Sequence, residues 1–262
     1  MSILPYAEAG DGVPLLMIHG FPHDRRLWRE QLDGLRRNAC VIAPDLRGFG
    51  QAPPAPEGMT IEDHAADLKA LMDHKRISKA VICGLSMGGY VALAFAERYP
   101  KAVQRLILCS TRSGADDAKA KEGRTAMARR ISENGVEQLA DAMLPKMLAA
   151  STIKGSTEAA ATVRLMMATQ APAGLIAALH AMAARPDRTG LLASIKVPTR
   201  VIAGTADAMI PSSESEAMAH AIPGSDLMLI PEAGHLPNVD APKAFNSALR
   251  AFLVGMHQEA KG

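Results

Sequence analysis

The sequence predicts an α/β fold built on a mostly parallel sheet. Short apolar runs bounded by turn residues recur along the chain, and they do not alternate with polar residues, as expected of strands buried on both faces. Helical patterns separate several of these runs, which favours strand–helix–strand units. A long stretch without a convincing strand, from about 111 to 192, interrupts this alternation. The six runs are 14–20, 39–45, 79–84, 103–110, 198–204 and 225–231.

Three helical segments accompany these strands. Apolar residues within 59–73 recur at helical spacing, and residues 87–98 are apolar on all sides until Glu97, which predicts a buried helix that ends before Pro100. Near the C-terminus, Asp240 is placed to cap a helix with one apolar face. That face comprises Ala244, Phe245, Ala248, Leu249, Phe252 and Leu253.

The interrupting stretch has its own helical pattern. Two apolar faces stand out in it, one within 136–147 and one within 175–183, both rich in alanine, leucine and methionine. We therefore predict an α/β-type core formed by residues 1–111 and 193–262, with a helical cap over 112–192 inserted between two late strands. An extra helical layer of the main domain is the alternative.

Composition excludes several classes of function. The chain has 262 residues, 48% hydrophobic and 21% charged, with a formal net charge of +2, which fits a soluble globular protein and gives no electrostatic case for nucleic acid or an acidic membrane. Cys40, Cys83 and Cys109 are too scattered for a disulfide framework or a zinc site. No secretory signal and no long apolar span is visible. We expect a cytoplasmic protein and make no prediction of its oligomeric state.

The segment GLSMG, with Ser86 at its centre, matches the G-x-S-x-G pattern of a nucleophile elbow. It follows a strand-like run and opens a helix-like one, as such a turn requires. Gly84 and Gly88 remove side chains that would collide in it, and Gly89 lets the helix approach the strand. The backbone N–H of Met87 would then face an oxyanion at the helix N-terminus. A glycine-rich connection with an idle serine is the alternative.

A serine nucleophile needs a base, and the base needs an orienting carboxylate. Asp207 follows the strand-like run that ends at Gly204, and His235 follows the run that ends at Ile230. Carboxyl ends of parallel strands meet at one edge of a sheet, where open α/β sheets bind ligands. We therefore predict that Ser86, Asp207 and His235 lie together.

A second oxyanion donor is available in HGFPHD at 19–24. Gly20 ends a strand there and would let the N–H of Phe21 face Ser86. Among competing acids, Asp45 is interpreted as part of an internally bonded turn and Glu232 as a solvated loop charge. The remaining histidines considered lie in helical patterns and have no metal-ligand spacing, so no metal site is predicted. They are His64, His74, His180 and His220.

Taken together, HGFP, DLRGFG, GLSMGG, GTADAMIP and AGHLPN, in this order, resemble the α/β-hydrolase superfamily over essentially the whole chain. The resemblance implies a serine hydrolase with Ser86 as nucleophile, His235 as base, Asp207 as orienting acid, and the Phe21 and Met87 amides as oxyanion donors. It implies no metal or organic cofactor, and it identifies the helical stretch as the family's cap. The short N-terminus suggests that the family's first antiparallel edge strand is missing.

Within the superfamily the sequence is most similar to small carboxylesterases, 3-oxoadipate enol-lactonases and haloperoxidase-like esterases. We expect hydrolysis of carboxylic esters of small, largely apolar substrates through an acyl-enzyme. An enol-lactonase or a carbon–carbon bond hydrolase with the same triad is the alternative, followed by a non-catalytic binding protein on this fold.

Two groups of residues in the insertion bear on the substrate. An enol-lactonase would bind a carboxylate, for which arginines near the start of the cap are candidates, with solvated surface arginines as the alternative. Flexible methionines suit an adaptable apolar pocket, with the cap's own core as the alternative. The arginines are Arg112, Arg124, Arg129 and Arg130, and the apolar residues are Met143, Met147, Met166, Met167, Leu175 and Met182.

Overall fold

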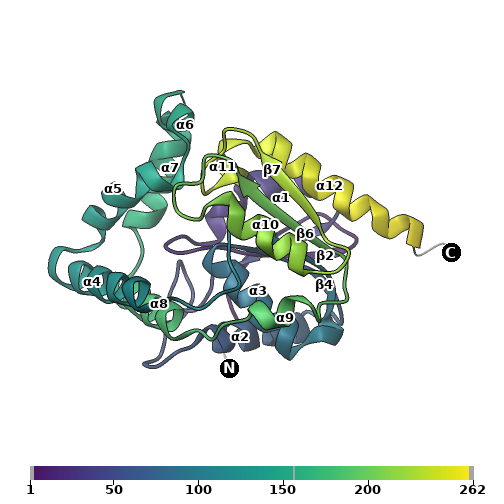
Figure 1. Ribbon diagram of the computed structural model, residues 1–262, viewed down its shortest axis with the longest axis horizontal. Coiled ribbons are helices and arrows are strands. Elements are labelled where there is room, and N and C mark those ends of the chain that lie inside the picture. Colours follow the sequence, from purple (N-terminus) through teal and green to yellow (C-terminus); the bar gives the residue numbers. More distant parts are fainter. Residues whose placement is uncertain (1–2, 156, 260–262) are drawn as a thin grey trace.

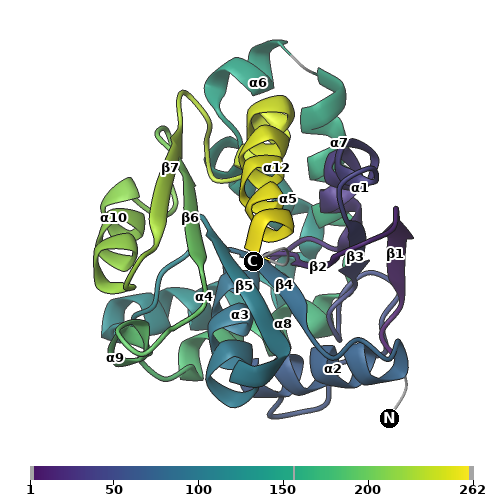
Figure 2. The same ribbon diagram turned by 90° about the vertical axis from the view of Figure 1, so that its right-hand side faces the viewer.

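A seven-stranded sheet with the order β1-β3-β2-β4-β5-β6-β7 runs through the molecule (Figure 2). The computed structural model describes residues 3–155 and 157–259. Within the sheet β1 is antiparallel to β3, and every other neighbouring pair is parallel. The strands are β1 (Tyr6–Ala9), β2 (Pro14–Ile18), β3 (Cys40–Pro44), β4 (Ala80–Leu85), β5 (Val103–Cys109), β6 (Thr199–Gly204) and β7 (Asp226–Ile230).

The prediction of an α/β fold with a mostly parallel sheet is confirmed. Strands β2 to β7 lie in the six apolar runs, and only β4 extends beyond its run, by one residue at Leu85. All six residues of β4 are buried because β2 and β5 flank it and helices cover both faces. Such a strand has no polar face, which is why its sequence does not alternate.

The expectation of a missing edge strand is wrong. Strand β1 pairs with β3 over four residues, from Tyr6 opposite Pro44 to Ala9 opposite Val41. None of its residues is fully buried, because it covers only the edge of β3. An edge strand of this kind has no run of apolar residues from which it could be predicted. The ion pair between Glu8 and Lys75 lies on its solvent side.

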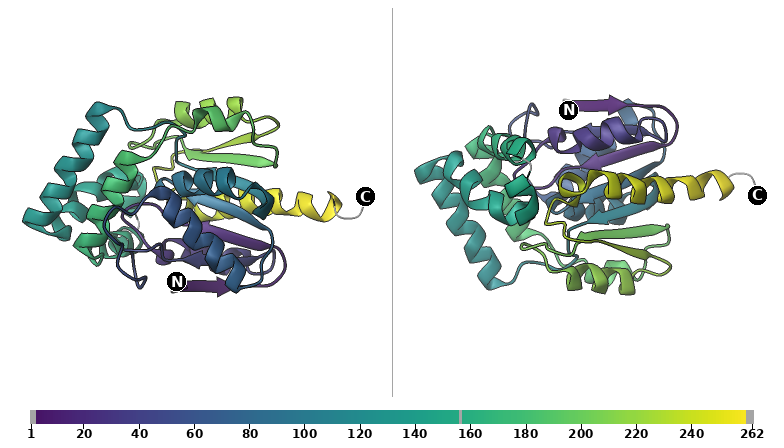
Figure 3. Two further views of the ribbon diagram at one scale, coloured as in Figure 1. Left: turned by 90° about the horizontal axis from the view of Figure 1, so that it is seen from below. Right: turned by 90° about the horizontal axis from the view of Figure 1, so that it is seen from above.

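Helices cover both faces of the sheet (Figure 3). Helices α1 and α12 lie on one face, α2 and α3 lie on the other, and α10 packs on β6 and β7. Thr60 begins α2 with a capping box, in which its side chain and that of Asp63 each bond the other's backbone N–H. The elements are η1 (Arg25–Trp28), α1 (Arg29–Leu35), α2 (Ile61–His74), α3 (Met87–Arg98), η2 (Pro100–Ala102), α10 (Ser212–Ala221), α11 (Pro237–Asp240) and α12 (Pro242–Glu259).

In the described part of the chain, six helices connect β5 to β6. The first five, called the cap helices below, gather at one end of the molecule, with α4 packed on α8 and α5 on α7 (Figure 1). The two apolar faces expected from the sequence lie in α5 and α8. The helices are α4 (Ala118–Asn134), α5 (Val136–Met147), α6 (Ala150–Gly155), α7 (Thr157–Ala168), α8 (Pro172–Ala184) and α9 (Thr189–Leu192). The division into a core and a cap domain at 112–192 stays a prediction.

Charged side chains connect this insertion to helices α2 and α3. Arg188, between α8 and α9, is only 5% exposed and pairs with Glu62 on α2 and Glu97 on α3. Asp116, near the start of the insertion, pairs with Arg185 near its end, and the guanidinium of Arg185 lies 4.0 Å from the ring centroid of Tyr90 on α3. These contacts connect the C-terminal end of the insertion to α2 and α3, and the Asp116–Arg185 pair connects its two ends to each other.

Across the described part of the chain, no single helix is long and apolar enough to cross a membrane. The segments Glu158–Ala168 and Pro172–Ala184 reach the required length and hydropathy only together, and they meet at a bend of 89°.

The prediction that Asp240 caps the C-terminal helix is wrong. Asp240 ends the short helix α11, and α12 begins two residues later at Pro242. Pro237 and Pro242 each favour the first turn of a helix, so the chain ends one helix and starts the next between them. The Asp240 carboxylate instead accepts hydrogen bonds from the backbone N–H groups of Gly234 and Ala149.

His64 lies on the buried side of α2 and is 2% exposed. Burial is the main cause that lowers its pKa to about 3, and the nearby imidazole of His19 acts in the same direction. In the unfolded chain a histidine titrates near pH 6.5 (about that value in model peptides). Between these two values only the unfolded chain binds the proton, so acidification through this range favours unfolding.

Replacing His64 by Phe should therefore change how stability depends on pH. Each pH unit below about 6.5 favours the unfolded wild type by about 1.4 kcal/mol for this group, and the variant lacks that term. We expect the variant to gain stability relative to the wild type as pH falls from 7 to 5, measured by urea unfolding. A stability difference that is the same at both pH values would contradict the assignment.

Candidate active site

Ser86 occupies the turn between β4 and α3 with φ 55° and ψ −116°. A non-glycine residue rarely adopts this conformation, and the surrounding backbone must hold it there. Two hydrogen bonds do so, from the Ser86 N–H to Cys109 O at 2.9 Å and from the Thr111 hydroxyl to Ser86 O at 2.8 Å. The side chain is partly exposed rather than packed into the core.

The glycines around Ser86 have the steric roles expected from the sequence. A Cβ on Gly84 would lie 2.2 Å from Gly88 O, and a Cβ on Gly88 would lie 2.2 Å from Ile18 O on β2. A Cβ on Gly89 would lie 2.4 Å from the Thr111 hydroxyl that bonds Ser86 O. The turn can therefore form only when these three positions carry no side chain.

Asp207 and His235 are hydrogen-bonded to each other. His235 Nδ1 lies 2.9 Å from Asp207 Oδ2, and both side chains are at most 1% exposed. The other carboxylate oxygen of Asp207 accepts from the N–H groups of Met209 and Ile210 at 2.8 and 3.0 Å. These bonds orient the carboxylate, and its bond to Nδ1 fixes the tautomer in which Nε2 carries no proton. His235 Nε2 is buried and has no hydrogen-bond partner among the described residues.

One turn connects the serine with this pair. A Cβ on Gly20, at the end of β2, would lie 3.1 Å from Ser86 Cβ, so the chain at Gly20 runs alongside the serine. The turn closes where the His23 N–H donates to Gly20 O at 3.0 Å, and the nearby imidazole of His235 contributes to lowering the pKa of His23. Ser86 and His235 therefore both lie near residues 20–23, and they are not hydrogen-bonded to each other in this conformation.

The two amides expected to form an oxyanion hole lie beside Ser86. Met87 is the first residue of α3, and Phe21 directly follows Gly20. Neither N–H donates to another atom of the described residues. Two free donors at the start of a helix and in an adjoining turn form a site where negative charge can develop.

His19 supports the Phe21 turn from behind. Its Nδ1 donates to Gly20 O at 3.0 Å, and its Nε2 accepts from the Leu46 N–H at 3.0 Å. Burial lowers the pKa of His19, which agrees with a neutral ring that has one donor and one acceptor. The ring also contacts Phe49 edge-on, and Phe49 in turn contacts Phe21.

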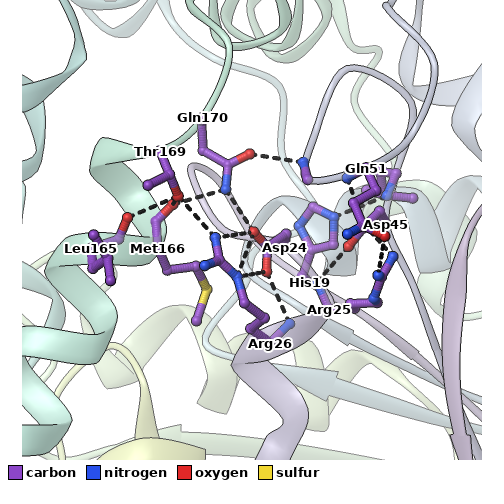
Figure 4. A network of polar contacts seen from close by, with 12 residues as sticks. His19, Asp24, Arg25, Arg26, Asp45, Gln51, Leu165, Met166, Thr169 and Gln170 are labelled. Carbon is purple, nitrogen blue, oxygen red and sulfur yellow. Dashed lines mark hydrogen bonds and ion pairs between the residues drawn. The ribbon is translucent and has the colours of Figure 1, made fainter.

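A buried polar network joins this turn to the cap helices (Figure 4). Asp24 accepts from the Arg26 side chain and from Gln170 Nε2 at 2.8 Å, and Gln170 Oε1 accepts from the Gly50 N–H at 2.9 Å. Arg26 also donates to the Thr169 hydroxyl. Within this network the side chain of Arg26 is half exposed to solvent, whereas Asp24 and Gln170 are buried. The end of α7 is thereby held against the loops that follow β2 and β3.

Asp240 performs a similar role on the other side of the site. Its carboxylate joins Gly234, which precedes His235, to Ala149 at the start of α6, and the Leu236 N–H donates to Met147 O. The loop that carries His235 is thus bonded to the cap helices at two points. Sequence reasoning missed this role because the partner Ala149 lies 91 residues away.

The competing acids behave as predicted. Asp45 accepts from the backbone and side chain of Arg25 and from the Gln51 N–H, all at 2.6–2.8 Å, so it is a structural turn residue. Glu232 is exposed. Among the described residues, no group of three or more His, Cys, Asp or Glu side chains is arranged to hold a metal ion.

The arginines considered for carboxylate binding divide into three groups. Arg129 and Arg130 are exposed, which agrees with the alternative that they are solvated surface arginines. Arg124 pairs with the buried Asp116. Arg112 directly follows Thr111, is partly buried, and its Nε has no hydrogen-bond partner among the described residues. Of the four, Arg112 alone combines a place beside the serine with an unpartnered buried donor.

The five methionines considered for a pocket, Met143, Met147, Met166, Met167 and Met182, are buried, as expected of the cap's own core. Met166 also lines a cavity of about 400 Å³ between the cap helices and the core, together with Arg26, Val163 and Asp240. Ser86 does not line this cavity. The pattern therefore fits the core interpretation for most of these methionines.

Three comparisons with known proteins agree with this architecture. A family model described as alpha/beta hydrolase fold matches residues 13–151, more than half of the chain. A thermophilic esterase from Thermogutta terrifontis is 42% identical, with 97% of this chain and 94% of that chain covered and a TM-score of 0.94.

Some relatives carry a lactonase name. 3-Oxoadipate enol-lactonase 2 of Acinetobacter baylyi is 27% identical over 252 residues, which cover 95% of this chain and 92% of the relative. The enol-lactonase of Burkholderia xenovorans is 29% identical, covers 96% of each chain and has a TM-score of 0.89.

Substituting Gly88 by Ala should destabilise the fold. The new Cβ would meet the Ile18 carbonyl of a buried strand, so the backbone must shift, at a cost of about 1–3 kcal/mol in the free energy of unfolding. Gly123→Ala on α4 is the matched control, because nothing lies within 4 Å of its added Cβ and alanine favours helix there. Urea unfolding measures both. Equal stability of the two variants would contradict the steric role of Gly88.

Proposed function

The chain belongs to the α/β hydrolase fold family, and on that premise we propose that it is a serine hydrolase that cleaves carboxylic esters of small, largely apolar substrates through an acyl-enzyme. The observation that carries the proposal is the buried Asp207–His235 pair with its free Nε2, next to the turn that flanks Ser86. The 42% identity to an esterase supports the choice of ester substrates.

The reaction begins with Ser86. Its Oγ attacks the ester carbonyl while His235 Nε2 takes the hydroxyl proton, and the carbonyl oxygen becomes an oxyanion that the Phe21 and Met87 amides stabilise. His235 then gives the proton to the leaving alkoxide, and the carbon–oxygen bond of the ester breaks to leave an acyl group on Ser86.

Deacylation repeats these steps with water. His235 accepts a proton from water as the water oxygen attacks the acyl carbon, and the collapse of the second oxyanion returns the proton to Ser86 Oγ. Asp207 stays ionised throughout. Its three hydrogen bonds orient the imidazole, and its charge stabilises the imidazolium that forms in each transition state.

Lactone hydrolysis is the second candidate, since a lactone is an internal ester and needs the same steps. Two observations favour it. Relatives at 27–29% identity are named enol-lactonases. In addition, the unpartnered donor of Arg112 lies one residue from Thr111, whose hydroxyl bonds Ser86 O, and suits a substrate with a carboxylate.

A fluorophosphonate probe tests the serine mechanism. We expect it to label Ser86 in the wild type, and we expect Ser86→Ala to abolish labelling and to lower kcat for p-nitrophenyl acetate by about 10⁴-fold or more. Mass spectrometry of the labelled peptide identifies the site. Ser212→Ala, on the surface helix α10, is the control and should keep full labelling. Ester hydrolysis at the wild-type rate by Ser86→Ala would disprove the mechanism.

A substrate panel separates the two candidates. We expect kcat/KM to be highest for short or medium p-nitrophenyl esters and lower for an enol-lactone that bears a carboxylate. Arg112→Met should leave kcat/KM for the neutral esters unchanged. If a carboxylate substrate is preferred, the variant should lower kcat/KM for that substrate about tenfold or more, since a hydrogen bond to a charged group contributes about 1.5–3 kcal/mol. A strong preference for the carboxylate lactone would replace the ester assignment by the lactonase one.

A further inference from the structure

Along the chain, His23 lies between a segment beside the serine and a residue that contacts the segment after α7. It is the last residue of the turn that begins at Gly20, next to Ser86, and that carries the Phe21 amide. The residue after it, Asp24, is bonded to Gln170 at the end of α7 (Figure 4). His23 therefore follows the oxyanion-type amide by two residues and precedes the contact with the cap helices by one.

The side chain of His23 is fully buried, and neither of its ring nitrogens has a hydrogen-bond partner among the described residues. Buried polar groups are normally paired, because an unpaired one loses its hydrogen bonds to water without replacement. His19, four residues earlier, is equally buried, but both of its ring nitrogens form hydrogen bonds. The fold thus satisfies one imidazole in this segment and leaves the other free.

The surroundings of His23 keep its ring uncharged. Burial is the main cause that lowers its pKa to about 3, and the nearby imidazoles of His19 and His235 act in the same direction, against Asp24 and the Gly20 carbonyl. A neutral imidazole offers one N–H donor and one acceptor nitrogen. It matches a hydroxyl group, which can accept and donate, or a carbonyl oxygen, and it supplies no charge for a carboxylate.

We propose that His23 is a specificity-determining residue whose ring binds a neutral oxygen of the substrate within a few bonds of the scissile carbonyl. This inference rests on the proposed ester hydrolysis and narrows its substrate class to esters or lactones that carry a hydroxyl or keto group near the reacting carbonyl. A purely hydrocarbon acyl chain leaves both ring nitrogens unpaired, whereas the oxygenated substrate satisfies one or both.

The test compares matched ethyl esters by pH-stat titration. Ethyl 3-hydroxybutyrate and ethyl 3-oxobutyrate are the oxygenated substrates, and ethyl butyrate is the hydrocarbon reference. We expect the wild type to favour the oxygenated esters in kcat/KM. His23→Phe keeps an aromatic ring of similar size without nitrogens, and we expect it to lower the ratio of kcat/KM values, oxygenated over hydrocarbon, by about 5- to 100-fold.

Two further variants separate binding from a structural role. His64→Phe removes another buried histidine that has an unpartnered nitrogen, and we expect it to leave the ratio unchanged. His23→Gln retains a donor and an acceptor, and we expect it to restore part of the preference. A loss of activity by His23→Phe that is equal on all three esters would overturn the proposal and indicate that the ring nitrogens bind only a buried water.

A spectroscopic measurement avoids any substitution at His23. In Ser86→Ala protein labelled with ¹⁵N-histidine, the His23 ring resonances should shift with ethyl 3-hydroxybutyrate and not with ethyl butyrate. Equal responses to both esters would overturn the proposal. Fluorophosphonate labelling of the wild type keeps the two proposals distinct: labelled Ser86 with an unchanged ratio refutes only the role of His23, whereas an unlabelled, inactive protein refutes ester hydrolysis and the role of His23 with it.

Discussion

Ser86 can hold a positive φ only because the backbone of three neighbouring segments closes around it. Cys109 O on strand β5 accepts a hydrogen bond from its N–H, the Thr111 hydroxyl donates to its carbonyl, and the chain that follows β2 passes beside it at Gly20. The glycines at 84, 88 and 89 are consequences of this crowding, since each added Cβ would lie within 2.4 Å of a backbone or side-chain atom. The register of β2, β4 and β5 therefore sets the position of the serine, and the remaining groups are placed relative to it.

Buried or partly buried carboxylates connect the loops around this turn, and each accepts hydrogen bonds from segments far apart in the chain. Asp24 joins the Phe21 turn to Gln170, and Asp240 joins the His235 loop to Ala149. Asp45 joins the loops after β2 and β3. Because an unpaired buried carboxylate is costly, each of these contacts constrains both of its partners. The cap helices are thus held at the same edge of the sheet that carries Ser86, Asp207 and His235.

Three histidines surround the Phe21 turn, and they differ in how their nitrogens are used. His19 is satisfied on both sides, His235 is satisfied at Nδ1 by Asp207, and His23 is satisfied on neither side. Among these three rings, the unpartnered nitrogens are thus both nitrogens of His23 and Nε2 of His235. An imidazole whose nitrogens are all used supports the backbone, whereas one with a free nitrogen is available to a reacting group or a substrate.

The sequence by itself determined the α/β class, the six parallel strands and the order in which Ser86, Asp207 and His235 follow them. These features are local: a strand buried on both faces is apolar throughout, and the residue after its carboxyl end lies at a known edge of the sheet. Strand β1 was not predicted from the sequence, because a strand at the exposed edge of a sheet needs no apolar pattern. Only the tertiary structure decided that Asp240 bonds Gly234 and Ala149 rather than capping α12, that Gln170 reaches Asp24, and that His23 is buried without partners. Each of these depends on a contact between segments distant in sequence, and a side chain's neighbours across the fold leave no periodic trace in its own segment.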